Sequence, residues 1–88
     1  MWQIKWEDRA HKELKKLDAS VQKSILKFTR ERIMGHDNPR QRGQPLLHDK
    51  SGLWRYRVGD YRLICQIEDS CFTVLVVACG HRKEIYDH

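Results

Sequence analysis

Apolar and polar residues alternate at the start of the chain, and the pattern then changes to a helical spacing. Trp2, Ile4 and Trp6 alternate with Gln3 and Lys5, and a period of two residues predicts a short strand with one apolar face. Because the alternation stops after Trp6, the strand is expected to end there and to lead into a different kind of element.

Two helices are predicted after this strand. Acidic residues open segment 7–17 and suit the positive end of a helix dipole, and its apolar residues recur at helical spacing. Asp18 or Ser20 can cap a second helix, which continues through residues 21–34. The apolar stripe of that second helix comprises Val21, Ile25, Phe28 and Ile33.

Three further strands are predicted in the second half of the chain, over residues 53–58, 61–68 and 71–79. Gly59-Asp60 and Asp69-Ser70 separate them and are typical of two-residue hairpin turns. The order β-α-α-β-β-β predicts an α+β fold, in which two N-terminal helices pack on one face of a mostly antiparallel sheet.

A long polar segment separates the helices from these strands. Residues 36–51 contain turn-forming and charged residues and are expected to form a loop. Loops of this length in a small domain are often functional. Leu46 and Leu47 are expected to hold the loop against the core.

Length and composition are those of one small soluble domain. The chain has 88 residues, of which 40% are hydrophobic and 33% charged, so we expect a single domain over residues 1–88. No apolar run is long enough for a signal peptide or a membrane span. The three cysteines form no CxxC pair, which favours free thiols and a cytoplasmic location over a zinc site.

The positive charge gathers in the middle of the chain. The net charge is +5, and residues 40–62 alone carry six Lys or Arg against two Asp or Glu. A basic segment of this kind makes a polyanion partner plausible, although a solvated basic surface explains the charge equally well.

The first hairpin is expected to place like charges together. A turn at residues 59–60 pairs the two strands so that Arg57 lies opposite Arg62, with Arg55 on the same face. Like charges directly opposite in a sheet are unfavourable by up to ~1 kcal/mol. A bound phosphate would compensate for the repulsion, and the alternative is three solvated arginines that splay apart. The other face collects the side chains of Trp54, Tyr56, Val58, Tyr61, Leu63 and Cys65.

The second hairpin extends the expected register to the end of the chain. With residues 69–70 as its turn, Arg62 pairs with Val77, and Arg82 points away from the arginines unless the strand bulges or ends near Gly80. The residues that this register adds to the arginine face are Cys79 and His81.

These side chains are sufficient for RNA cleavage without a metal ion. Arg62 and Arg82 can stabilise the charge of the transition state, while a base removes the proton of the 2′-OH and an acid protonates the leaving oxygen. His81 has a suitable ordinary pKa for either proton transfer, and Tyr86 could stack on a base or exchange a proton. The sequence does not assign the base and the acid.

Three segments of the chain resemble one protein family. They read WEDRAHKELKKLD, LWRYRVGDYRLICQIED and VLVVACGHRKEIY, and together they cover nearly the whole chain. They are similar to the RelE branch of the RelE/ParE toxin superfamily. The features that carry the likeness are Gly-Asp-Tyr-Arg before an apolar strand and Gly-His-Arg before Ile-Tyr.

The resemblance implies a function. RelE-like toxins are small cytoplasmic proteins of type II toxin-antitoxin systems, each encoded beside a cognate antitoxin protein. They act as mRNA interferases, which are endoribonucleases that enter the ribosomal A site and cut mRNA by 2′-OH attack, with no metal or other cofactor. A ParE-like toxin would instead bind DNA gyrase and inhibit it without nuclease activity, and this alternative stays open.

The resemblance also implies roles for individual residues. Arg55 and Arg57 match the basic residues of the first hairpin strand, which would bind RNA phosphates. The matches to the catalytic residues of the family are Arg62, His81, Arg82 and Tyr86.

Overall fold

The chain folds into a helical hairpin and a five-stranded sheet. A computed structural model describes residues 1–46 and 52–85 of the protein. The strands are β1 (Gln3–Trp6), β2 (Gln44–Pro45), β3 (Trp54–Val58), β4 (Tyr61–Glu68) and β5 (Thr73–His81). The helices are α1 (Asp8–Lys15) and α2 (Ala19–Phe28), which a π-helical segment, Thr29–Met34, extends. Short 3-10 turns cover Pro39–Gln41 and Asp69–Cys71.

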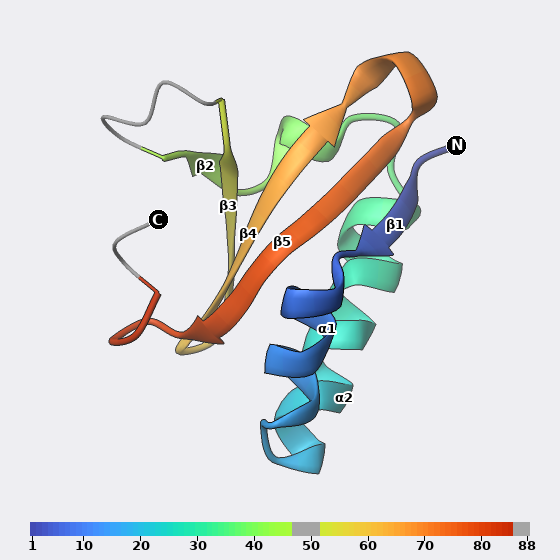
Figure 1. The fold of residues 1–88 in the computed structure, drawn as a ribbon. Helices are drawn as coiled ribbons and strands as arrows, with labels where there is room; N and C mark the ends of the chain where they lie inside the picture. Colours follow the sequence, from blue (N-terminus) through green and yellow to red (C-terminus); the bar gives the residue numbers. More distant parts are fainter. Residues whose placement is uncertain (47–51, 86–88) are drawn as a thin grey trace.

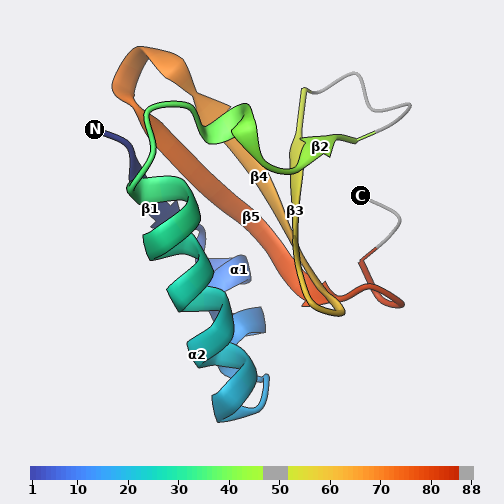
Figure 2. The same cartoon turned by 180° about the vertical axis from the view of Figure 1, so that it is seen from behind.

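Both helices cover one face of the sheet (Figures 1 and 2). The strand order is β1-β5-β4-β3-β2. β1 runs parallel to β5, and the other neighbours are antiparallel. The predicted α+β class and the order of the helices are therefore confirmed. In the part of the chain described, no helix is long and apolar enough to cross a membrane.

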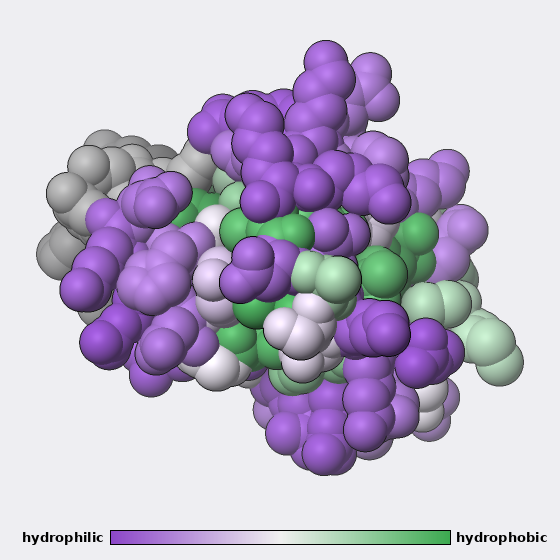
Figure 3. Space-filling view, turned by 90° about the horizontal axis from the view of Figure 1, so that it is seen from below, coloured by the Kyte–Doolittle hydropathy of each residue, from purple (hydrophilic) through white to green (hydrophobic). Residues whose placement is uncertain are grey.

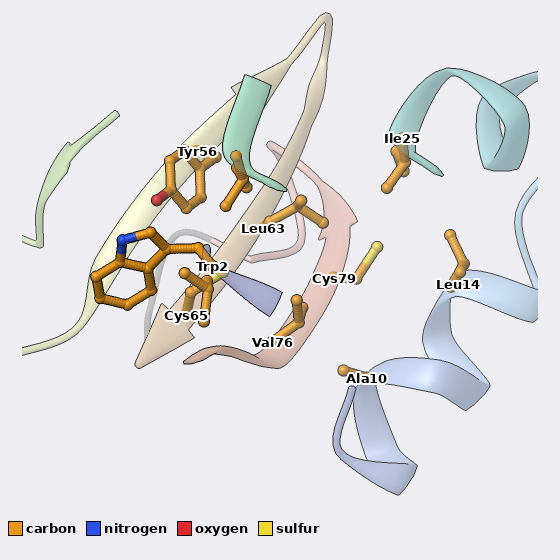
Figure 4. Packing of buried hydrophobic residues seen from close by; sticks show 11 residues of the cluster. Trp2, Ala10, Leu14, Ile25, Tyr56, Leu63, Cys65, Val76 and Cys79 are labelled. Carbon is orange, nitrogen blue, oxygen red and sulfur yellow. The ribbon is translucent and has the colours of Figure 1, made fainter. Parts of the chain in front are cut away.

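The main core lies between the helices and the sheet. Leu63, Val76 and Cys79 point from β4 and β5 toward Leu14 of α1 and Ile25 of α2 (Figure 4). Leu63, Val76 and Ile25 are fully buried. This packing is the outcome of the sequence pattern, because a strand period of two and a helical spacing each direct one apolar face inward.

The register of the first hairpin is the one predicted from the sequence. Gly59 and Asp60 form the turn, and Arg57 pairs with Arg62. Tyr56 is fully buried on the helix side, and Trp54 is partly buried against the same core. The arginines of both strands therefore lie on the face opposite the helices.

The predicted register of the second hairpin is wrong. The connection runs over residues 69–72, two residues longer than predicted, so that Glu68 pairs with Thr73. A bulge beside Ile64 then adds one more residue to β5. The longer connection alone would keep every side chain on its expected face, whereas a one-residue bulge exchanges the two faces beyond it.

This exchange moves the residues at the end of β5. Cys79 pairs with Leu63 and is buried on the helix side, not on the arginine face as predicted. His81 pairs with Tyr61, so it too changes sides. Arg62 pairs with Gly80, and the chain that follows brings Arg82 to the arginine face.

The segment before β3 is more ordered than a polar loop. Gln44 and Pro45 form β2, which pairs with the outer edge of β3. The sequence did not predict β2. Leu46 packs on a small second cluster made by Ile64, Ala78 and Ile85 on the arginine side of the sheet. Leu47, the other predicted anchor, lies outside the described residues.

Side-chain hydrogen bonds to backbone carbonyls fix this segment in place. Trp2 Nε1 donates to the Asp37 carbonyl at 2.9 Å, and Trp54 Nε1 donates to the Arg42 carbonyl at 2.8 Å. The Tyr56 hydroxyl donates to the Pro39 carbonyl at 2.6 Å. At the far end of the sheet, Arg40 and Asp69 form a bidentate ion pair at 2.9 and 2.8 Å.

The buried hydrogen bond of Tyr56 gives a stability prediction. Tyr56→Phe leaves the Pro39 carbonyl without this donor and should lower the free energy of unfolding by about 1–3 kcal/mol. Urea denaturation followed by circular dichroism measures the change. Tyr61→Phe is the control, because its ring is only partly buried. Equal stability of the Tyr56→Phe and wild-type proteins would contradict the role given to this bond.

Gly43 gives a second prediction, because its backbone and its surroundings both exclude a side chain. Its φ is +79°, and a Cβ would overlap the Arg55 carbonyl and lie 2.6 Å from Trp54 Nε1. Gly43→Ala should therefore destabilise the fold by about 2–4 kcal/mol, from backbone strain and overpacking together.

The matched control for Gly43 is Gly59→Ala. Gly59 also has a positive φ, +60°, but a Cβ there meets nothing within 4 Å. Only backbone strain remains, so the loss should be about 1–2 kcal/mol. The stability of both variants is measured by thermal unfolding. Equal losses of stability would show that the segment before β3 can move to make room for a side chain at residue 43.

Candidate functional site: an arginine pocket on the open face of the sheet

Four arginines from three parts of the sheet surround one hollow on the face opposite the helices. Arg55 and Arg57 come from β3, Arg62 from β4, and Arg82 from the turn after β5. The hollow has a volume of about 170 Å³, and Leu46 and Ile85 complete its lining. We call this cluster of Arg55, Arg57, Arg62 and Arg82 the arginine pocket.

The charges in the arginine pocket repel one another. Partial burial lowers the pKa of the Arg62 guanidinium from its ordinary value, and three neighbouring guanidinium groups lower it further, those of Arg57, Arg55 and Arg82. The Asp60 carboxylate acts in the opposite direction. Arg62 stays protonated at neutral pH, so the repulsion is present in the folded protein.

One donor of the Arg55 side chain lacks an acceptor. The Nε atom of Arg55 is buried and has no hydrogen-bond partner among the described residues. A buried donor without a partner costs about 1–3 kcal/mol. The crowded charge of the four guanidinium groups favours an anion with several oxygen acceptors.

Hydrogen bonds to backbone carbonyls hold two of the arginines beside the turn of the first hairpin. Arg62 NH1 donates to the carbonyls of Gly59 and Tyr61, at 3.0 and 2.9 Å. The backbone N–H of Arg82 donates to the Asp60 carbonyl at 2.8 Å, and its side chain lies 3.8 Å from the Asp60 carboxylate. The turn between β3 and β4 thus orients one arginine from β4 and one from the turn after β5.

A second hollow continues from the arginine pocket across the edge of β3. It has a volume of about 220 Å³, and it shares Arg55 and Arg57 with the arginine pocket. Its other walls include Phe28 and Arg42. Sequence reasoning did not single out Arg42, because the loop was not expected to pair with β3. The one sequence feature that could have indicated Arg42 is the adjacent Gly43. Its backbone lies close to the Arg55 carbonyl, which places Arg42 beside the sheet.

His81 does not line the arginine pocket. Its ring meets the Tyr61 ring edge to face at 5.4 Å, and Tyr61 packs on the helix-side core. Its Nδ1 accepts a hydrogen bond from the Lys83 backbone at 3.1 Å. Five of the six predicted site residues are therefore described, and four of them meet in one pocket. Tyr86, the sixth, lies outside the described residues.

A larger hollow lies elsewhere and has a different chemistry. It has a volume of about 330 Å³ and lies between α2 and the turn of the first hairpin. Its apolar lining residues are Val21, Ile25, Val58 and Tyr61. Figure 3, the view from below, shows hydrophobic residues in the middle of this end of the molecule with hydrophilic residues around them. An apolar lining suits packing contacts, whereas the arginine pocket suits a phosphate.

The arginine pocket supplies charge but not proton transfer. Guanidinium groups bind phosphate oxygens through planar N–H groups and stabilise negative charge that develops on them. Within the described lining, no group has an ordinary pKa near neutral pH. A base and an acid would have to come from neighbouring residues or from the substrate complex.

A comparison with protein families places the chain in a group of toxins. Residues 4–86 match the family described as the ParE toxin of type II toxin-antitoxin systems, parDE. The match covers both helices and every strand except the first residue of β1.

Individual relatives carry the names of RelE-type toxins. Toxin RelG of Mycobacterium tuberculosis is 28% identical over 83 residues, which cover 94% of this chain and 93% of that protein. Toxin RelE of the same organism is 29% identical over 77 residues, covering 88% and 77% of the two chains.

A solved structure supports the same relationship. The RelBE2 toxin-antitoxin complex of Mycobacterium tuberculosis contains a chain with a TM-score of 0.81 and 25% identity, and the match covers 94% of this protein and 93% of that chain. The isolated RelE toxin of E. coli shares the fold, with a TM-score of 0.72 and 23% identity. The chain described here therefore belongs to the RelE/ParE toxin family of type II toxin-antitoxin systems.

Proposed function

We propose that the protein is a ribosome-dependent endoribonuclease that cuts mRNA in the A site without a metal ion. The observation that carries the proposal is the arginine pocket, where four guanidinium groups share one hollow and no carboxylate is among the described residues that line it. The pocket matches the phosphate of a nucleic acid in both charge and hydrogen-bond donors.

The proposed reaction uses the 2′-OH of the substrate as the nucleophile. Arg55 and Arg57 bind the phosphate oxygens, and Arg62 and Arg82 stabilise the extra negative charge as the 2′-oxygen attacks the phosphorus. The bond to the 5′-oxygen breaks, which leaves a 2′,3′-cyclic phosphate and a 5′-OH. DNA resists this route because it lacks the 2′-OH.

Proton transfer is assigned to His81 and Tyr86 as part of the proposal. His81 would have to leave its contact with the Tyr61 ring and reach around the end of β5, since it starts on the helix side of the sheet. Tyr86 follows Arg82 closely in the sequence and would serve as the other proton donor or acceptor.

Two partners belong to the proposal. A cognate antitoxin is one, because solved structures of similar fold are toxin-antitoxin complexes, among them the RelBE2 complex of Mycobacterium tuberculosis. The ribosome is the other. It would hold the mRNA in the geometry for in-line attack. A pocket lined mainly by phosphate-binding arginines does not fix that geometry by itself.

A second candidate function is inhibition of DNA gyrase by binding. The family model that matches residues 4–86 is named for ParE toxins, which favours this alternative. The relatives named RelE and RelG and the arginine pocket favour the nuclease.

One pair of assays separates the two functions. Purified protein is added to translating ribosomes, and mRNA ends are mapped by primer extension, while gyrase supercoiling is measured in parallel. Cuts in phase with codons, together with normal supercoiling, would support the nuclease. Intact mRNA with blocked supercoiling would establish the gyrase inhibitor in its place.

Replacing Arg62 should remove most of the cleavage activity. Arg62→Ala deletes the guanidinium that the other three arginines surround, and we expect cleavage to fall about 10²–10³-fold. Arg30→Ala is the control, because it removes the same charge from an exposed position on the helix side. Both variants should fold, as judged by circular dichroism. Cleavage at the wild-type rate by folded Arg62→Ala would exclude Arg62 from the site.

Binding of RNA should weaken steeply as salt rises. If the arginine pocket holds the reacting phosphate and the basic residues around it contact about three more, the logarithm of the binding constant should fall with the logarithm of salt concentration with a slope of about −3. Fluorescence anisotropy with a labelled 2′-O-methyl RNA oligonucleotide, which cannot be cleaved, gives the slope. A slope near zero would contradict phosphate binding by this pocket.

A further inference from the structure

The end of β5 has a strand partner on only one side. β1 pairs with β5 only as far as Trp6 and Val76, whereas β5 continues to His81. Beyond that point β4 still pairs along one edge of β5. The other edge faces α1.

A carboxylate from α1 takes the place of the missing strand. Glu13 Oε1 accepts a hydrogen bond from the backbone N–H of Cys79 at 2.9 Å. Glu13 Oε2 lies 3.4 Å from Arg9 Nε, one helical turn earlier, so the carboxylate is held from its own helix. Burial and then the Glu13 charge raise the pKa of the Cys79 thiol to about 12, which agrees with a carboxylate close to this residue.

The segment that Glu13 holds leads directly to Arg82. After Cys79 come Gly80 and His81, and the chain then turns, with the Glu84 N–H donating to the His81 carbonyl at 2.8 Å. A glycine just before a turn gives the backbone more freedom than other residues would. The direction in which Arg82 leaves the sheet therefore depends on how firmly both edges of β5 are held at this point.

We propose that Glu13 is a positioning residue for the arginine pocket: by holding the Cys79 backbone it fixes the end of β5, so that Arg82 stays beside Arg62. Glu13 itself touches no part of the pocket, because it lies at the edge of β5 among Arg9, Lys16 and Leu17. The inference rests on the proposed function in one respect, which is that the pocket binds RNA.

The test compares two replacements of nearly equal size. Glu13→Gln keeps an oxygen that can accept the Cys79 N–H, whereas Glu13→Met keeps the length and the helix propensity but offers no such acceptor. Affinity for a labelled 2′-O-methyl RNA oligonucleotide is the readout, since it needs no cleavage. Glu13→Met should bind about tenfold more weakly than wild type, and Glu13→Gln within about twofold of it.

A double-mutant cycle shows whether Glu13 acts through Arg82. In an Arg82→Ala background, Glu13→Met should cause less than about a twofold further loss, because the side chain it positions is gone. In an Arg55→Ala background the full loss of about tenfold should remain, since β3 holds Arg55 independently. Equal losses in both backgrounds would overturn the proposal.

Amide hydrogen exchange supplies a readout that does not involve RNA. The Cys79 amide should exchange slowly in wild type and Glu13→Gln and much faster in Glu13→Met. Glu7→Ala is the control for charge, because the Glu7 side chain makes no capping hydrogen bond. A Glu13→Met protein that no longer folds would show Glu13 to be a general stabiliser and would overturn the positioning role.

The outcomes separate this inference from the proposed function. If wild type fails to bind the RNA oligonucleotide, the proposed function is wrong, and the exchange data still decide whether Glu13 holds β5. If wild type binds and Glu13→Met binds equally well, the proposed function stands and the positioning role of Glu13 is wrong.

Discussion

The turn at Gly59 and Asp60 decides which side chains of the first hairpin face the core and which face the arginine pocket. A two-residue turn sets the pairing of β3 with β4, and that pairing decides which side chains share a face. One face then carries the fully buried Tyr56 and Leu63 against the helices, and the other carries the arginines. If the pairing of β3 with β4 shifted by one residue, guanidinium groups would be buried and aromatic rings exposed. The hydrophobic core and the arginine pocket therefore both require the observed register.

The fold tolerates repulsion in the arginine pocket because other contacts fix its walls. Burial of the opposite face stabilises the hairpin, and the hydrogen bonds of Trp54 and Tyr56 fasten the preceding segment to β3. Without a ligand, the crowded charges remain unfavourable. A site of this kind binds an anion with little reorganisation, because its donors are already held in place.

The sequence predicted the parts of the fold that depend on periodicity and on short turns. The helical hairpin, β3, β4 and the register between those strands follow from alternating residues and from Gly59-Asp60, and they are confirmed. The connection after Glu68 was predicted too short, because its 3-10 turn and the left-handed Phe72, with a φ of 49°, have no clear signal in the residue pattern. The residue pattern also did not predict the bulge beside Ile64, although this bulge decides that Arg82, and not His81, faces the pocket. β2 was missed because it has only two residues and the second is a proline, a pattern typical of loops. Arg42 was missed with it, because it precedes this strand.

Binding of phosphate in the arginine pocket can be measured by thermal unfolding of the free protein. Melting temperatures are compared in sodium phosphate and in sodium chloride of equal ionic strength, for wild type and for Arg55→Ala. A ligand that binds only the folded state stabilises it by about 1.4 kcal/mol at ten times its Kd. If the arginine pocket binds phosphate, the melting temperature of wild type will be higher in phosphate than in chloride, and most of the difference will be lost in Arg55→Ala. Identical melting temperatures of wild type in the two salts would contradict phosphate binding.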